Sequence, residues 1–258
     1  MAIFGEMDSL FNLVSRFRRR SHVALPVKRF KQLIKEHDFT FAEFASLLPD
    51  WMEQPLSAFR SDEAIEKLLT DGFLDWTADQ FGVRKKWLQG ADDAVYDSIL
   101  YGYKNIDGFF ETMDSMDLLN PYTTMFVFTS GSLTENSCAR LWVALEVPFA
   151  PKDEKDEHVR YIPLSDQWVW EHPPAHDHLI YIAQQFVERG GHSAPVYQVP
   201  AMTMERMHRR ELIPNIRHLR FCKFAGFTPN TKPPNLRSFA TNRCRNVEAD
   251  VPQKEGLI

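Results

Sequence analysis

The sequence predicts an α+β protein, in which an all-helical N-terminal domain precedes a small α/β domain with an antiparallel sheet. Three observations predict it. Helical periodicity with capping residues runs over residues 25–92, β-rich runs separated by turns follow over 123–171, and a helical segment at 176–191 leads to a further strand. With 258 residues, 44% of them hydrophobic, the chain is long enough for one large domain or two smaller ones.

The first two helices have clear sequence signals. In the first, over 27–38, the apolar residues share one face: Val27, Phe30, Leu33 and Ile34. In the second, Thr40 and Glu43 have the spacing of a capping box, and Pro49 ends the helix.

A short third helix is expected to begin near Gln54. Pro55 suits its first turn, and Leu56 and Phe59 are the expected core anchors. A longer helix over 62–81 follows, interrupted or weakened at Gly72 and ended by Gly82.

The closing motif consists of Gly82-Val83, three residues, Trp87-Leu88 and then Gly90. With the preceding helices, it resembles the helix-turn-helix domain of the lambda-repressor and Cro-like family of DNA-binding regulators over about residues 25–92. The matching second-helix positions are Thr40, Glu43, Phe44 and Ala45. The resemblance implies a DNA-binding transcriptional regulator that acts as a homodimer on double-stranded DNA and reads bases with Gln54, Ser57 and Arg60.

The charge distribution leaves a second reading open. Residues 25–92 contain nine Lys or Arg and twelve Asp or Glu, an acidic balance for a domain that lies on a polyanion. If DNA is bound, we expect the phosphate contacts to come either from the N-terminal arm, through Arg18, Arg19 and Arg20, or from the basic cluster between Arg206 and Arg220. The alternative is an adaptor or antagonist that reuses the helix-turn-helix fold for protein contacts.

The rest of the chain is predicted to contain a three-stranded meander (123–133, 137–149 and 159–171), a helix over 176–191 and a strand over 194–202. In outline this module resembles PAS or GAF domains, which bind small-molecule or protein effectors. A ligand pocket on one face of the sheet is one interpretation, and a core filled by the aromatic side chains is the alternative that we favour.

The predicted domain boundaries divide the chain into five parts. They are a basic arm at 1–24, the helix-turn-helix domain at 25–92, a connecting or dimerisation helix at 93–120, the α/β domain at 121–228 and a basic tail at 229–258. The dimer residues of that helix are expected to be Val95, Ile99, Phe109, Met113 and Met116.

We expect no cofactor, no metal site and no enzymatic activity. His172, His176 and His178 lack the spacing of a zinc motif, and no phosphate-binding glycine loop is present. No run of about 18 apolar residues predicts a membrane span, and the three cysteines are expected to be free thiols, so we expect a cytoplasmic protein.

Overall fold

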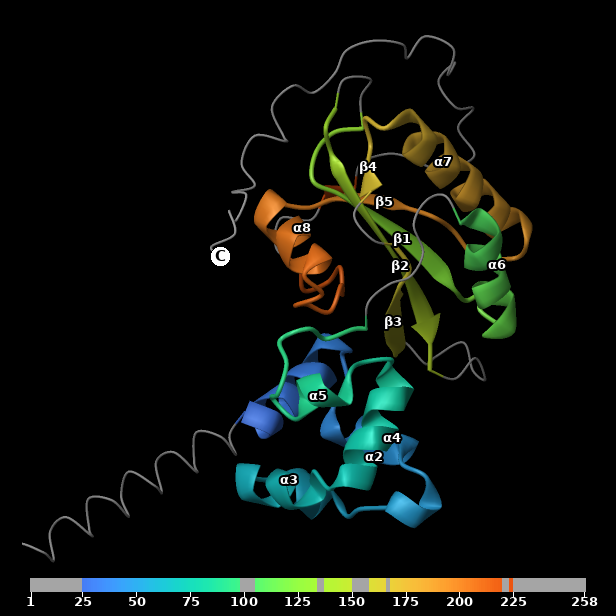
Figure 1. Ribbon diagram of the computed structural model, residues 1–258. Coiled ribbons are helices and arrows are strands. Elements are labelled where there is room, and N and C mark those ends of the chain that lie inside the picture. The colour runs from blue at the N-terminus through green and yellow to red at the C-terminus, as the bar shows by residue number, and fades with distance from the viewer. Residues whose placement is uncertain are drawn as a thin grey trace, which may run out of the picture.

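The computed structural model describes residues 25–97, 105–133, 137–149, 158–165 and 168–219, together with the backbone of 223–224. In Figure 1, the helices of the N-terminal third lie at one end of a sheet, and the later helices flank the sheet. The predicted α+β class is confirmed. Within the described ranges, none of the helices combines the length and apolar character that crossing a membrane requires.

The N-terminal part begins with a helix over residues 25–36, where the apolar periodicity predicts one. The helices that follow are α2 (Phe41–Leu47), the 3-10 helices η1 (Asp50–Met52) and η2 (Leu56–Phe59), α3 (Asp62–Leu68), α4 (Asp71–Phe81) and α5 (Lys85–Leu88).

The predicted capping box is present at the start of α2. The backbone N–H of Glu43 donates to Thr40 Oγ1 at 3.2 Å, and the backbone N–H of Thr40 donates to Glu43 Oε2 at 2.7 Å. Both bonds satisfy N–H groups that helical geometry leaves without partners.

The long helix predicted after residue 62 is divided into α3 and α4. The break lies at Leu69 and Thr70, two residues before Gly72, because Thr70 caps α4 by accepting from the backbone N–H of Phe73 at 3.4 Å. Gly82 ends α4 in the left-handed region at φ +66°, a conformation that glycine adopts without a Cβ clash.

Arg29 ties the first helix to the closing motif. Its side chain is buried, donates to the carbonyl of Trp87 at 3.0 Å and lies over the Trp87 ring at 5.5 Å from the centroid. It also contacts the backbone carbonyl of Asp92 and forms an ion pair with Asp93 at 2.7 Å. These bonds satisfy a buried guanidinium and fix the position of α5.

The described strands are β1 (Thr124–Thr129), β2 (Arg140–Pro148), β3 (Val159–Pro163), β4 (Trp168–Val169), β5 (Val196–Gln198) and β6 (Lys223–Phe224). Their order is β3-β2-β1-β5-β6, and β4 pairs with β2 beyond the end of β3. The antiparallel meander β1-β2-β3 is as predicted. The sheet as a whole is mixed because α7 (Pro173–Glu188) carries the chain back, so that β5 runs parallel to β1.

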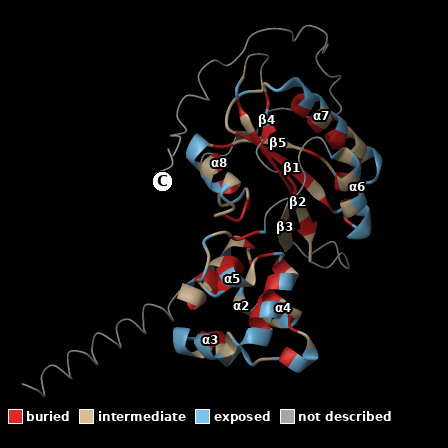
Figure 2. Ribbon diagram, viewed as in Figure 1, coloured by how far each residue is buried: buried red, intermediate tan, exposed pale blue. Residues whose placement is uncertain are grey.

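The two central strands are buried on both faces (Figure 2). One face, with Phe126, Phe128, Trp142 and Ala144, belongs to a core shared with the N-terminal helices and α8 (Ala201–His208). The other face packs against α6 (Ile106–Ser115) and α7. Burial on both faces explains why the sequences of these strands are continuous apolar runs and do not alternate between apolar and polar residues.

The N-terminal helices pack directly against the sheet. The rings of Phe81 and Phe149 have centroids 4.7 Å apart, and Phe39 stacks on His158 at 3.9 Å. A hydrophobic cluster therefore crosses the predicted boundaries of the helix-turn-helix domain, and the domain boundaries themselves stay a prediction.

The helix expected from residue 93 is absent over 93–97. There, the backbone N–H of Val95 donates to the carbonyl of Arg210 at 2.7 Å and its carbonyl accepts from Arg84 at 2.7 Å, so its backbone groups serve tertiary bonds. Of the expected dimer residues, Val95, Phe109 and Met113 are buried within the chain, Met116 is exposed and Ile99 lies outside the described residues.

The prediction of three free thiols is wrong for Cys138, which is disulfide-bonded. The other two cysteines, Cys222 and Cys244, lie outside the described side chains. Sequence spacing could not reveal the bond, because a disulfide depends on Cα positions that the fold sets. This finding removes the support that free thiols gave to a cytoplasmic location.

Candidate functional site

The segment that was predicted to be the recognition helix is not an α-helix. It consists of η1 and η2, single 3-10 turns that follow Pro49 and Pro55. Both prolines have φ −66° and extended ψ values, so each holds the chain out of the helical region just before a turn. The prediction of a helix starting near Gln54 is therefore wrong, and the segment forms two short 3-10 turns.

The two expected anchors of this segment behave differently. Phe59 is buried, with its ring centroid 5.6 Å from that of Phe41 and 6.0 Å from that of Phe44. Leu56 is 54% exposed, so its prediction as a core anchor is wrong. Residues i and i+3 of a 3-10 turn lie on the same side, so the difference comes from the packing of Phe59 against the rings of Phe41 and Phe44.

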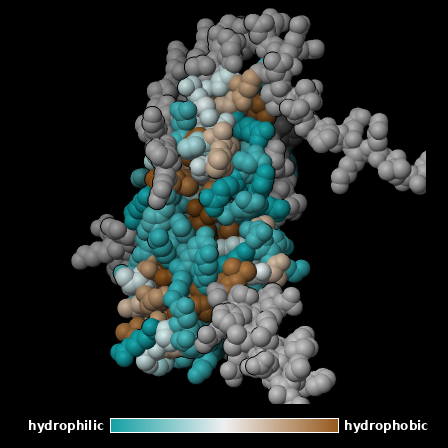
Figure 3. Space-filling model, turned by 90° about the vertical axis from the view of Figure 1, so that its left-hand side faces the viewer, coloured by the Kyte–Doolittle hydropathy of each residue, from teal (hydrophilic) through white to brown (hydrophobic). Residues whose placement is uncertain are grey.

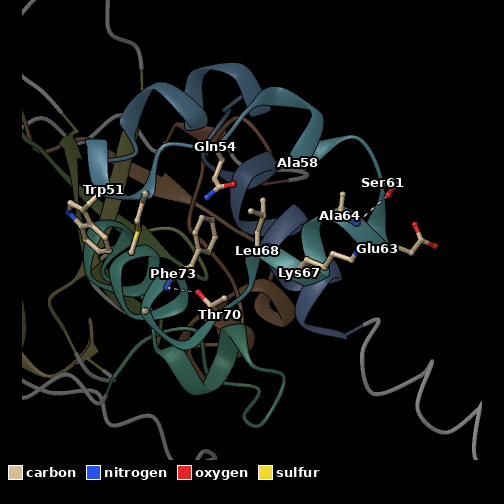
Figure 4. A pocket seen from close by; sticks show the side chains of 12 residues that line it. Trp51, Gln54, Ala58, Ser61, Glu63, Ala64, Lys67, Leu68, Thr70 and Phe73 are labelled. Atoms are coloured by element: carbon tan, nitrogen blue, oxygen red, sulfur yellow. Dashed lines mark hydrogen bonds between the residues drawn. The ribbon is translucent and has the colours of Figure 1, made fainter.

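A groove of about 650 Å³ lies between this segment and the helices α3 and α4 (Figure 4). Trp51 lies at one end, and Ser61 and Glu63 lie at the other. Gln54 points into the groove toward Leu68 and Phe73. The residues that line it are Trp51, Met52, Gln54, Ala58, Ser61, Glu63, Ala64, Lys67, Leu68, Thr70, Gly72 and Phe73.

Two large apolar side chains are exposed at or beside this groove. Trp51 is 74% exposed although it is among the largest apolar side chains of the molecule, and Leu56 follows in the next turn. Elsewhere, on the face shown in Figure 3, hydrophilic side chains cover much of the described surface and apolar ones form smaller areas among them. Exposed tryptophans of this kind are enriched among residues that contribute strongly to protein–protein binding.

The surroundings of the groove are acidic. Residues 50–79 contain eight Asp or Glu and two Lys or Arg, and all ten side chains belong to exposed residues. Three of the acids are partly neutralised, since Asp62 pairs with Lys31, and Asp71 and Asp75 both pair with Lys85 at 2.7 Å. These bonds raise the pKa of the Lys85 ammonium. Among the residues that line the groove itself, the charged ones are Glu63 and Lys67.

The structure separates the residues that were predicted to read bases. Gln54 is half-buried in the groove, whereas Ser57 and Arg60 are exposed on η2 and at its C-terminal end and do not line the groove. Arg18, Arg19 and Arg20 lie outside the described residues. Their roles in DNA binding stay predictions.

Sequence reasoning missed Trp51, Lys67 and Leu68 as parts of a surface groove. The available signal was the pair of prolines at 49 and 55, which leaves too few residues between them for a helix that buries both Trp51 and Met52. Of these two, only Met52 is buried.

Apart from the groove, a cluster of polar side chains lies where the N-terminal helices meet the sheet. His37 is buried, and its Nδ1–H donates to the carbonyl of Leu33 at 2.8 Å. Burial lowers the pKa of His37 from 6.5 to about 4. Nearby, the Tyr161 hydroxyl donates to Glu146 Oε2 at 3.2 Å, and burial raises the pKa of Glu146.

This cluster also fixes the segment after α8. His218 contacts Glu36 through Nδ1 and Asp38 through Nε2, each at 2.9 Å. Asn215 is buried and donates through Nδ2 to the carbonyl of Glu36 and to Asp38 Oδ2, both at 2.9 Å. The cluster thus joins elements far apart in the sequence.

The histidines near α7 do not converge on a common point. His176 is buried, with Nδ1 at 3.0 Å from Asp177 and its ring edge-on to Trp170. Among the described side chains, no group of three His, Cys, Asp or Glu is placed to hold a metal ion.

Comparison with known proteins adds no assignment: the chain matches no family model, no curated protein and no solved structure.

Proposed function

We propose that this protein is a protein-interaction module, an adaptor or antagonist that binds its partner through the groove between η1, η2, α3 and α4. The observation that carries the proposal is the exposed Trp51 at the end of a groove formed by an acidic part of the chain, residues 50–79. The site has the size of a ligand groove, and its lining combines apolar side chains with the polar side chains of Gln54, Ser61, Glu63, Lys67 and Thr70.

The chemistry of the groove defines the class of partner. Leu68 and Phe73 provide apolar surface, Trp51 provides a large flat side chain at one end, and Glu63 with neighbouring acids provides negative charge at the other. This arrangement suits an amphipathic, basic helix or peptide whose apolar residues enter the groove and whose Lys or Arg side chains face the acidic residues around it.

The same features weigh against base reading. A reader of the major groove presents several side chains from one helix, whereas η2 is a four-residue turn. The acidic side chains around it would repel phosphates. DNA binding through Ser57 and Arg60 remains the second candidate, because both residues are exposed in the segment that corresponds to the family's recognition helix.

Affinity capture with the full chain tests the proposal against this second candidate. We expect the wild-type chain to retain one stoichiometric protein, and Trp51→Ala to lose it while folding normally. Genomic DNA fragments selected at moderate salt should show no enriched sequence. Enrichment of a sequence that depends on Arg60, with no partner sensitive to Trp51, would replace the proposal by DNA binding.

A further inference from the structure

We propose that Gln54 selects what enters the groove: an extended peptide segment whose main-chain N–H and C=O both pair with the Gln54 side-chain amide. This role of Gln54 rests on the proposed function, because it states how the same groove recognises its partner.

Gln54 places an unpaired amide inside the groove. Its side chain is half-buried and points toward Leu68 and Phe73 (Figure 4). Within the described part of the chain, this amide makes no hydrogen bond. Its NH2 group is therefore a free donor and its carbonyl oxygen a free acceptor, side by side.

The other polar side chains of the lining differ from Gln54. The hydroxyls of Ser61 and Thr70 accept from backbone N–H groups at the starts of α3 and α4. Glu63 and Lys67 are exposed, so their charged ends can stay in contact with water when the groove is filled. The amide of Gln54 is thus the group whose hydrogen bonds depend most on the occupant.

Filling the groove removes water from this amide. An amide that loses water without gaining partners weakens binding, so the occupant must bring both an acceptor and a donor. A residue in an extended chain presents its own N–H and C=O on the same side, as in the hydrogen-bonded pairs of an antiparallel sheet. An α-helix uses these groups internally. Of the helix and the extended peptide, the amide therefore favours the extended peptide.

The backbone around Gln54 holds the amide in place before binding. Gln54 lies between η1 and η2 and precedes Pro55, and a residue before proline is disfavoured in the helical region. The flanking turns are anchored in the core by the buried side chains of Met52 and Phe59. A short segment anchored at both ends loses little conformational freedom when a partner arrives.

A phage-displayed library of random linear peptides, selected on the full chain, supplies the probe. Peptides are kept if they bind the wild-type chain and lose affinity for Trp51→Ala, which assigns them to the groove. Their affinity for Gln54→Met should fall at least about tenfold, because methionine keeps the length of the side chain and removes both hydrogen bonds. Urea unfolding of Gln54→Met should match that of the wild-type chain.

Gln89→Met is the matched control. Gln89 is exposed at the end of α5 and does not line the groove, so its replacement should leave the affinity for the same peptides unchanged.

N-methylation of the peptide, one residue at a time, identifies the main-chain group that pairs with Gln54. Methylating the N–H that donates to the Gln54 carbonyl oxygen should weaken binding to the wild-type chain at least about fivefold. The same methylation should have little further effect on binding to Gln54→Met, because the bond is already absent there. This non-additivity assigns the hydrogen bond to the peptide main chain.

An affinity that Gln54→Met leaves unchanged would overturn the role of Gln54. Coupling of Gln54 to an Asn or Gln side chain of the peptide, and to none of its main-chain groups, would overturn it as well. In both cases the dependence on Trp51 leaves the proposed function standing. A selection that yields no peptide sensitive to Trp51 removes the proposed function and the role of Gln54 together.

Discussion

At the scale of single residues, His37 makes stability depend on pH. Its Nδ1–H donates to Leu33, and its buried Nε2 has no described partner, so a second ring proton would lie in the core without an acceptor. The folded-state pKa of about 4 lies below the ordinary 6.5, so the unfolded chain binds the proton first as the pH falls.

We expect His37 to cost the folded state about 2 kcal/mol between pH 6.5 and pH 5, with no effect above pH 7. Urea unfolding at several pH values measures this contribution as the difference between the wild-type chain and His37→Gln, which should depend less on pH. An identical slope for His37→Gln and wild type would contradict the assignment.

Two tryptophans allow a paired prediction. Trp87 is 3% exposed beneath the Arg29 guanidinium, and deleting a buried indole costs about 3–5 kcal/mol, so Trp87→Ala should unfold or strongly destabilise the helical part. Trp51→Ala should change the free energy of unfolding by less than about 0.5 kcal/mol, because that ring is largely in solvent. Thermal and urea unfolding of both variants provides the check, and equal losses would refute the contrast.

At the scale of elements, the capping box should hold the start of α2. Thr40→Ala removes the acceptor for the Glu43 N–H, and we expect a loss of about 1 kcal/mol in the free energy of unfolding. Thr40→Ser keeps the hydroxyl and should recover most of the loss. If Thr40→Ser were as unstable as Thr40→Ala in urea unfolding, the methyl group and not the cap would be responsible.

At the scale of the whole molecule, the shared core should make the helical part and the sheet unfold together. Phe81 lies on α4 and packs against Phe149, which follows β2. Phe81→Ala should therefore lower the stability of both parts by about 3–5 kcal/mol. Hydrogen exchange of amides in α4 and in β2 should accelerate equally.

A single urea transition seen by both fluorescence and circular dichroism would agree with this expectation. Acceleration confined to α4, or two separate transitions, would show that the predicted domains at 25–92 and 121–228 are independent in stability.

The local elements were predictable because their signals are short-range. The capping box at Thr40, the helix stop at Gly82 and the apolar runs of β1 and β2 each depend on residues within a few positions of one another. The sequence alone also indicated the acidic balance of residues 25–92, which already left protein binding open as an alternative.

Only the tertiary structure decided what the third helical segment is and what it exposes. Leu56 and Phe59 are both apolar, but of the two only Phe59 packs against Phe30, Phe41 and Phe44. The groove beside Trp51 likewise depends on α3 and α4 packing across it, and the parallel pairing of β5 with β1 depends on the return of the chain through α7. Burial and strand pairing are set by residues distant in the chain, so local patterns determine the elements but not which of their side chains remain at the surface.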